Sequence, residues 1–233
     1  MTFTLRPVRL PDFEVPHFRP QIPAEIYAGR ADAAYAGAGC HWLVVYADRE
    51  HLANMAFLTG FEPRFEEALL VLGSGGRRIL VTGNESGSYA VLSGLPDVEV
   101  VLCQSLSLLG QPREAAPNLE DVLAAIGIRK GDTIGLAGWK YLGPQEWRGR
   151  LPTFQVPAFI VDTLRAVAGD AGAVTDATPV LMHPEGGLRA VVDVHEIAAM
   201  EWAAARASAA VWRIVQGAQL GDDEFTAAAR MGY

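Results

Sequence analysis

The side chains that could carry metal or nucleophilic chemistry are few and scattered in this 233-residue chain. A hydrolytic zinc or two-metal centre needs several converging ligands, and no histidine here has a second histidine four positions on or a cysteine at ligand spacing. A nucleophile-elbow serine and a phosphate-binding glycine loop are missing too. We therefore expect no metal site, no cofactor site and no catalytic residue in this chain. The five histidines are His17, His41, His51, His183 and His195.

The two cysteines, Cys40 and Cys103, match no metal-ligand spacing and form no disulfide framework. Both adjoin predicted strands, which favours buried free thiols in a reducing compartment. His41 follows Cys40 directly, but neighbours on a strand point to opposite faces, so the two side chains should not meet. A nucleophilic cysteine in an unrelated hydrolase stays open as an alternative and would require an accessible thiol.

Arg64 is the residue best suited to bind a ligand. It lies in a polar and aromatic segment between a helix-like stretch that breaks at Thr59-Gly60 and the apolar run Ala68–Leu72. A guanidinium can pair with a carboxylate through two hydrogen bonds, and loops held between anchored elements commonly carry binding residues. Two other interpretations remain: the adjoining Glu66 and Glu67 neutralise Arg64 locally, or the segment is an ordinary surface turn.

The elements that must position these residues alternate along the chain. Apolar runs bounded by turn residues predict strands, and capped segments with helical periodicity lie between them. This alternation is typical of an α/β domain, with helices on a mixed or parallel sheet. Residues 179–192 are expected to be irregular. The predicted strands cover residues 41–47, 68–72, 78–82, 98–103, 132–136 and 174–178, and the predicted helices cover 23–36, 118–126 and 156–168, with a further helix capped by Asn84 or Ser86.

Two loops that follow predicted strands each allow two interpretations. Gly83-Asn84-Glu85 stands at the carboxyl end of a strand, where α/β sheets place ligand-binding loops, but it also suits an ordinary turn. Gly138-Trp139-Lys140-Tyr141 could face a ligand or cover the edge of the core.

A long helix is predicted to begin at Asp193, with Glu196 completing a capping box, and to run to about Gln216. Trp202 and Trp212 point away from its main apolar stripe, so we expect this helix to be covered on more than one side, by another part of the protein or by a partner subunit. A short helix within 222–231 follows. The stripe comprises Ile197, Met200, Ala204, Ala207, Val211, Ile214 and Val215.

The sequences of several segments resemble the amino-terminal domain of the creatinase/prolidase/aminopeptidase P family, the pita-bread metallohydrolases. Asn54–Phe61 reads N-x-x-F-L-T-G-F, and Arg64–Leu72 reads RFEEALLVL. Further motifs follow in the expected order and extend the resemblance over nearly the whole chain: ILVTGNE at 79–85, QSLSLLGQPR at 104–113, GLAGWKY at 135–141 and HEIAAMEWAAARAS at 195–208.

The resemblance implies a creatinase/prolidase-like α/β domain over residues 1–192, with a mixed sheet and helices on both faces. Residues 193–233 would be the linker helix and the beginning of a truncated pita-bread domain. In this family the catalytic domain holds two divalent metals (Mn, Co or Zn), which we expect only outside this chain, and the amino-terminal domain helps to build dimers and to cover active sites. Phe61, Arg64 and Phe65 match a loop that contacts substrate in creatinase-like members. The alternative is a free-standing, non-catalytic dimerisation or ligand-binding module.

Composition limits the remaining classes. Half of the residues are apolar, which allows a sizeable core, and the formal net charge of −8 without a Lys/Arg cluster argues against a nucleic-acid partner. No uncharged run reaches the roughly 20 residues that span a bilayer, and prolines and charges interrupt the amino-terminal segment. We expect a cytoplasmic homodimer.

Overall fold

The computed structural model describes residues 17–114, 116–149 and 152–232. The chain divides into two compact units. Pro23–Val191 forms an α/β unit, and the described residues of 192–232 group with those of 17–22 in a second unit. The two units are described separately below.

The α/β unit is built on a six-stranded sheet with the order β4-β3-β2-β1-β5-β6. β2 pairs antiparallel with β1 and with β3, whereas the β1–β5, β5–β6 and β3–β4 pairs are parallel. The expected mixed sheet is confirmed. The strands are β1 (Trp42–Ala47), β2 (Ala68–Gly73), β3 (Arg77–Thr82), β4 (Glu99–Leu102), β5 (Ile134–Ala137) and β6 (Val174–Asp176).

One edge of the sheet collects most of the strand ends. Because β2 runs against its neighbours, its first residue lies beside the last residue of β1, as the Ala47–Ala68 pair shows. The carboxyl ends of β1, β3, β4, β5 and β6 therefore meet at one edge, together with the amino end of β2. We call this the carboxyl edge. The loops that follow β1 and precede β2 both start from it.

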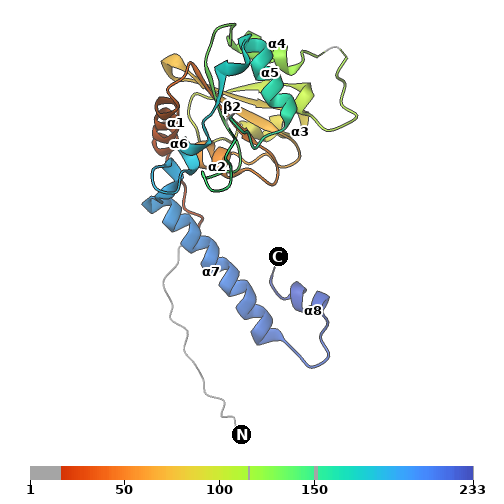
Figure 1. Cartoon of the computed structure of the whole chain (residues 1–233). Helices are drawn as coiled ribbons and strands as arrows, with labels where there is room; N and C mark the ends of the chain where they lie inside the picture. Colours follow the sequence, from red (N-terminus) through yellow and green to blue (C-terminus); the bar gives the residue numbers. More distant parts are fainter. Residues whose placement is uncertain (1–16, 115, 150–151, 233) are drawn as a thin grey trace. The chain divides into compact units, whose positions relative to one another are not determined.

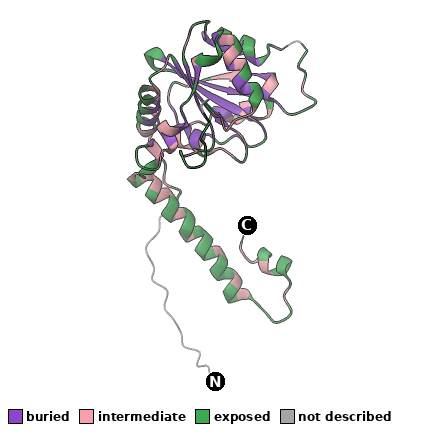
Figure 2. Cartoon of the chain, in the orientation of Figure 1, coloured by how far each residue is buried: buried purple, intermediate pink, exposed green. Residues whose placement is uncertain are grey.

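Helices cover both faces of the sheet (Figure 1). Alternate side chains of β1 point to opposite faces of the sheet. On one face Val44 packs in a core cluster with residues of α4 and α5, and on the other face α1 and α2 pack against β1. Every residue of β1 and β2 is buried, so the sheet forms the buried centre in Figure 2. The helices of this unit are α1 (Ala24–Ala38), α2 (Ala53–Thr59), α3 (Asn84–Ala90), α4 (Leu119–Ile126), α5 (Ala158–Ala168) and α6 (Thr178–Met182).

Local signals predicted several helix ends correctly. The Asn118 side chain accepts a hydrogen bond from the Asp121 N–H at 2.9 Å and caps α4, and Gly127 ends the helix with φ 114°. Gly169 ends α5 in the same left-handed region. This region favours glycine, because the Cβ of any other residue would crowd a backbone carbonyl oxygen there.

Two local predictions were wrong. Neither Asn84 nor Ser86 caps α3: its N-cap position is Gly83, which has no side chain to donate or accept. Residues 179–192 are not wholly irregular, because α6 starts at Thr178 with Pro179 in its first turn, and a 3-10 turn covers Leu188–Ala190. Proline is well tolerated at that helical position because its missing N–H has no partner there anyway.

The second unit contains α7 (Val194–Gly217) and α8 (Glu224–Ala229). The predicted capping box is confirmed: Asp193 Oδ1 accepts from the N–H groups of His195 at 2.8 Å and Glu196 at 3.0 Å, and Glu196 accepts from the Asp193 N–H at 3.3 Å. No residue of α7 is buried. Among the described helices, none combines the length and the apolar character that crossing a membrane requires.

Candidate functional site

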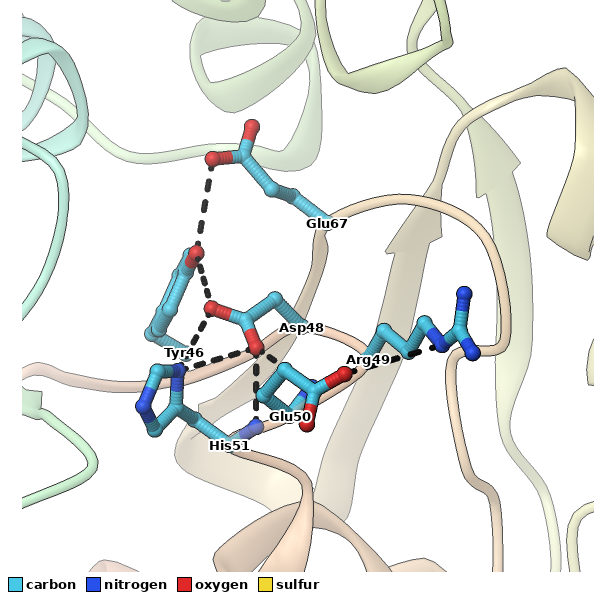
Figure 3. A network of polar contacts seen from close by, with 6 residues as sticks. All are labelled: Tyr46, Asp48, Arg49, Glu50, His51 and Glu67. Atoms are coloured by element: carbon cyan, nitrogen blue, oxygen red, sulfur yellow. Dashed lines mark hydrogen bonds and ion pairs between the residues drawn. The ribbon is translucent and has the colours of Figure 1, made fainter.

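A network of polar side chains lies at the carboxyl edge, where β1 ends and β2 begins (Figure 3). Tyr46 comes from the end of β1, Asp48 and His51 from the turn that follows it, and Glu67 from the residue before β2. The antiparallel entry of β2 brings Glu67 beside Tyr46, although the two lie 21 positions apart in the chain.

Asp48 is the centre of the network. Its Oδ1 accepts the N–H groups of Glu50 and His51, both at 2.8 Å, and its carboxylate lies 2.9 and 3.0 Å from Nδ1 of His51. Burial acts to raise the pKa of Asp48, but the hydrogen bonds from His51, Tyr46 and the turn outweigh it and hold that pKa below its ordinary value. Asp48 is therefore an ionised, oriented carboxylate at neutral pH.

Tyr46 stands between two carboxylates. Its hydroxyl lies 2.9 Å from Asp48 Oδ2 and 3.4 Å from Glu67 Oε1. Burial and the two acidic neighbours raise the pKa of Tyr46 well above its ordinary value, so the phenol stays protonated. Burial also raises the pKa of Glu67, with a further contribution from the charge of Asp48, and the hydrogen bond from Tyr46 offsets part of this. The single hydroxyl proton of Tyr46 is thus shared by two acceptors, the carboxylates of Asp48 and Glu67.

Trp139, in the loop after β5, stacks on His51 with ring centroids 4.1 Å apart and an interplanar angle of 27°. The residue Trp139 is 36% exposed. Trp139 therefore borders the network with part of its ring open to solvent, while the Tyr141 ring meets His183 edge-on at 5.5 Å.

Glu66 does not belong to the network of Tyr46 and Glu67 but contacts the start of α3. Its carboxylate accepts the N–H of Ser86 at 2.7 Å and that of Glu85 at 3.2 Å, so it caps the amino terminus of α3. Burial and the neighbouring Glu85 carboxyl raise the pKa of Glu66 to about 7. A Cβ at position 83 would lie 2.4 Å from Glu66 Oε2, so a side chain there would displace the Glu66 carboxylate.

Two open depressions meet at the network. The larger, about 490 Å³, is bordered by Phe65, Glu67, Leu108 and other residues, and the smaller, about 310 Å³, by Trp139, Phe154, Pro157 and others. Both include Tyr46, Asp48 and His51 in their walls. The carboxyl edge thus carries a concave surface with an acidic centre and apolar flanks.

The three residues matched to the substrate-contacting loop lie in different surroundings. Phe61 is 3% exposed and packs its ring 5.5 Å from that of Tyr89. Phe65 is 57% exposed and borders the larger depression. Arg64 is exposed, and its backbone N–H donates to the Tyr89 hydroxyl at 2.7 Å. It borders a third hollow of about 360 Å³, which adjoins the larger depression at Arg49 and Phe65.

Sequence reasoning missed the Asp48–His51 pair. The available signal was an acid placed directly after a predicted strand with a histidine three positions on, a spacing that a tight turn closes through the Asp48 carboxylate. Glu67 and Tyr46 carried no local signal, because their contact depends on the direction of β2.

Neither cysteine is paired with a base. Cys40 Sγ contacts the Trp42 carbonyl at 3.0 Å and the Gly135 N–H at 3.2 Å, whereas His41 Nδ1 accepts from the Thr133 N–H at 2.9 Å. Burial raises the pKa of both Cys40 and Cys103, which disfavours the nucleophilic thiolate. Among the described residues, no group of three or more His, Cys, Asp or Glu side chains is arranged to hold a metal ion.

Several solved structures share the fold of this chain. The chain is similar to the dipeptidase PepE from Mycobacterium ulcerans (TM-score 0.55, 20% identity, covering 91% of this chain and 49% of that one). It is also similar to an X-Pro aminopeptidase from Thermotoga maritima (0.56, 18%, 86% and 47%) and a prolidase from Pyrococcus furiosus (0.54, 14%, 90% and 51%). The chain spans about half the length of these structures. The fold implied by the sequence motifs is confirmed.

Two sequence comparisons add less. No family model matches the chain. A DNA ligase from Neisseria gonorrhoeae is 30% identical over 81 residues, which is 35% of this chain and 10% of the ligase. A match to so small a part of that protein carries no argument about function here.

Proposed function

We propose that this chain serves as the amino-terminal, non-metal-binding part of a metallohydrolase related to Xaa-Pro peptidases and creatinase. The observation that carries the proposal is the shared fold, which extends over about nine-tenths of the chain in structures of a dipeptidase and a prolidase. The ordered set of sequence motifs supports it independently. The two divalent metals of such an enzyme would be held by a catalytic domain outside these residues.

In this proposal the loop between α2 and β2 reaches the substrate. Arg64 and Phe65 are its exposed members, and the adjoining Glu66 fixes the loop to the amino terminus of α3. An exposed guanidinium on an anchored loop is suited to a substrate carboxylate, such as the free carboxyl terminus of a dipeptide. Phe61 would act behind them, as packing that supports the loop.

The test uses a complete enzyme that contains this domain and its metals. Arg64→Ala should raise KM for Xaa-Pro dipeptides by about ten-fold, with a smaller change in kcat, because a charge-assisted contact to the substrate is lost. Arg64→Lys should recover part of the affinity, and Arg129→Ala, at an exposed turn before β5, is the matched control. Unchanged kinetics together with a lower melting temperature would show that Arg64 is structural.

A further inference from the structure

The two depressions at the carboxyl edge adjoin each other, because Tyr46, Asp48 and His51 belong to the walls of both. We call the two depressions together the edge groove. One end has the apolar side chains of Phe65, Leu106, Leu108 and Leu109, and the other has Trp139, Phe154, Val156 and Pro157. Leu108 and Leu109 are 47% and 93% exposed, so this wall is open to a ligand.

The middle of the groove is acidic. Two cations also line it: Arg113 donates to the carbonyls of Ser107 and Leu108, and the exposed Arg49 lies 3.7 Å from the exposed Glu50. Asp48 and Glu67 then face the groove with His51 and Tyr46 as their hydrogen-bond partners. Glu66 is turned into the amino terminus of α3.

The hydrogen bonds in the middle of the edge groove favour a ligand that donates hydrogen bonds and accepts none. Tyr46 has one proton for two carboxylates, and its 3.4 Å separation from Glu67 is the longer of the two. A primary ammonium brings three donors and no acceptor, so it can bond to Glu67 and still reach Asp48. An anion would face two carboxylates, and an uncharged polar group would leave their charge uncompensated.

We propose that the edge groove binds an organic ammonium ion that carries an apolar or aromatic group. The ammonium lies beside the Tyr46 hydroxyl and bonds to Glu67 within reach of the Asp48 charge, and the apolar group lies against Trp139 or against the leucine wall. The amino-terminal residue of a peptide has this chemistry. This binding belongs to the present chain alone and needs neither a metal nor Arg64.

Titration calorimetry on the purified chain tests the proposal with 2-phenylethylamine as the probe. We expect saturable binding of the amine, little binding of its N-acetyl derivative and none of 3-phenylpropanoate. Methylamine, which keeps the charge without the ring, should bind more weakly than 2-phenylethylamine. Asp48→Asn and Glu67→Gln should each weaken binding about ten-fold, equivalent to about 1.4 kcal/mol.

The controls separate binding from folding. Glu62→Gln changes an exposed acid in the same loop outside the edge groove and should bind the amine normally. Asp48 also holds two backbone N–H groups of its turn, so if Asp48→Asn lowers the melting temperature, Glu67→Gln becomes the deciding variant. Equal binding of the amine and its acetylated form, absence of saturable binding at millimolar concentration, or unchanged affinity in Glu67→Gln would overturn the proposal. None of these results would bear on the effect of Arg64→Ala on hydrolysis.

Discussion

Glu66 shows how a single residue can hold a loop and a helix together. Local sequence assigned the cap of α3 to Asn84 or Ser86, yet the capping carboxylate comes from Glu66, 20 positions before Ser86. The carboxylate also lies against Gly83, where a side chain would collide with it. The loop that carries Arg64 and Phe65 is therefore tied to α3 by one acid that titrates close to neutrality.

This acid makes stability depend on pH. The pKa of Glu66 is about 7 in the folded chain against an ordinary 4.5. Between pH 4.5 and pH 7, Glu66 is therefore protonated in the folded state and ionised in the unfolded state. The associated stability is fully present below about pH 4.5 and is lost as the pH rises through 7. Glu85 shifts the opposite way, because its hydrogen bond with Glu66 lowers its pKa, and its contribution is lost only at lower pH.

We predict that the wild-type chain loses about 1–3 kcal/mol of unfolding free energy between pH 5 and pH 8 through this pair. Glu85→Gln should flatten that dependence, because an amide can donate to the Glu66 carboxylate and removes the second charge. Urea unfolding at a series of pH values measures both, with the exposed Glu120→Gln in α4 as control. Superimposable pH profiles for the wild type and Glu85→Gln would rule this mechanism out.

At the scale of elements, boundaries set by adjacent residues were predictable and those set by distant residues were not. Asn118, Gly127, Gly169 and Asp193 act through their own backbone neighbourhood, and each was placed correctly. The capping role of Glu66 and the Tyr46–Glu67 contact arise from chain segments brought together by the sheet. The acidic middle of the edge groove could not be predicted from the sequence for that reason, whereas Arg64 lies in a loop between α2 and β2 as the sequence indicated.

The capping box of α7 can be tested by itself. Asp193→Ala removes the acceptor of two amides in the first turn, which should destabilise the start of the helix by about 1 kcal/mol. Hydrogen exchange at His195 and Glu196 should then accelerate, while exchange near the middle of α7 stays unchanged. Glu201→Ala, an exposed change within the helix, serves as the control. Equal protection at His195 in both variants would show that the cap does not hold the first turn.

At the scale of the whole molecule, α7 exposes more apolar surface than a helix in water usually does. Large apolar side chains along it are about half exposed: Ile197 52%, Met200 59%, Val211 59%, Trp212 44% and Val215 58%. Burying one such side chain contributes roughly 1.5–3 kcal/mol, and exposed apolar patches commonly mark interfaces. Self-association through this helix would agree with the homodimer expected from the sequence.

We predict that the chain forms a dimer at micromolar concentration and that Met200→Glu combined with Val211→Glu shifts it toward monomer. Sedimentation velocity measures the change. Leu92→Glu, an equally conspicuous exposed position after α3 (80% exposed), should leave the dimer intact. A wild-type monomer whose Trp202 and Trp212 are both freely quenched by acrylamide would contradict the prediction.

The direction of β2 also has a consequence for the order in which the sheet assembles. β1, β2 and β3 follow one another in the chain and pair as neighbours, so the loops they close are short. The β1–β5 pair joins distant segments: His41 and Thr133, which flank it, are 92 positions apart. Loop closure costs more entropy as the loop lengthens. In refolding monitored by pulsed hydrogen exchange, Leu70 should therefore gain protection before Leu136, and the acidic middle of the edge groove should form before its Trp139 wall.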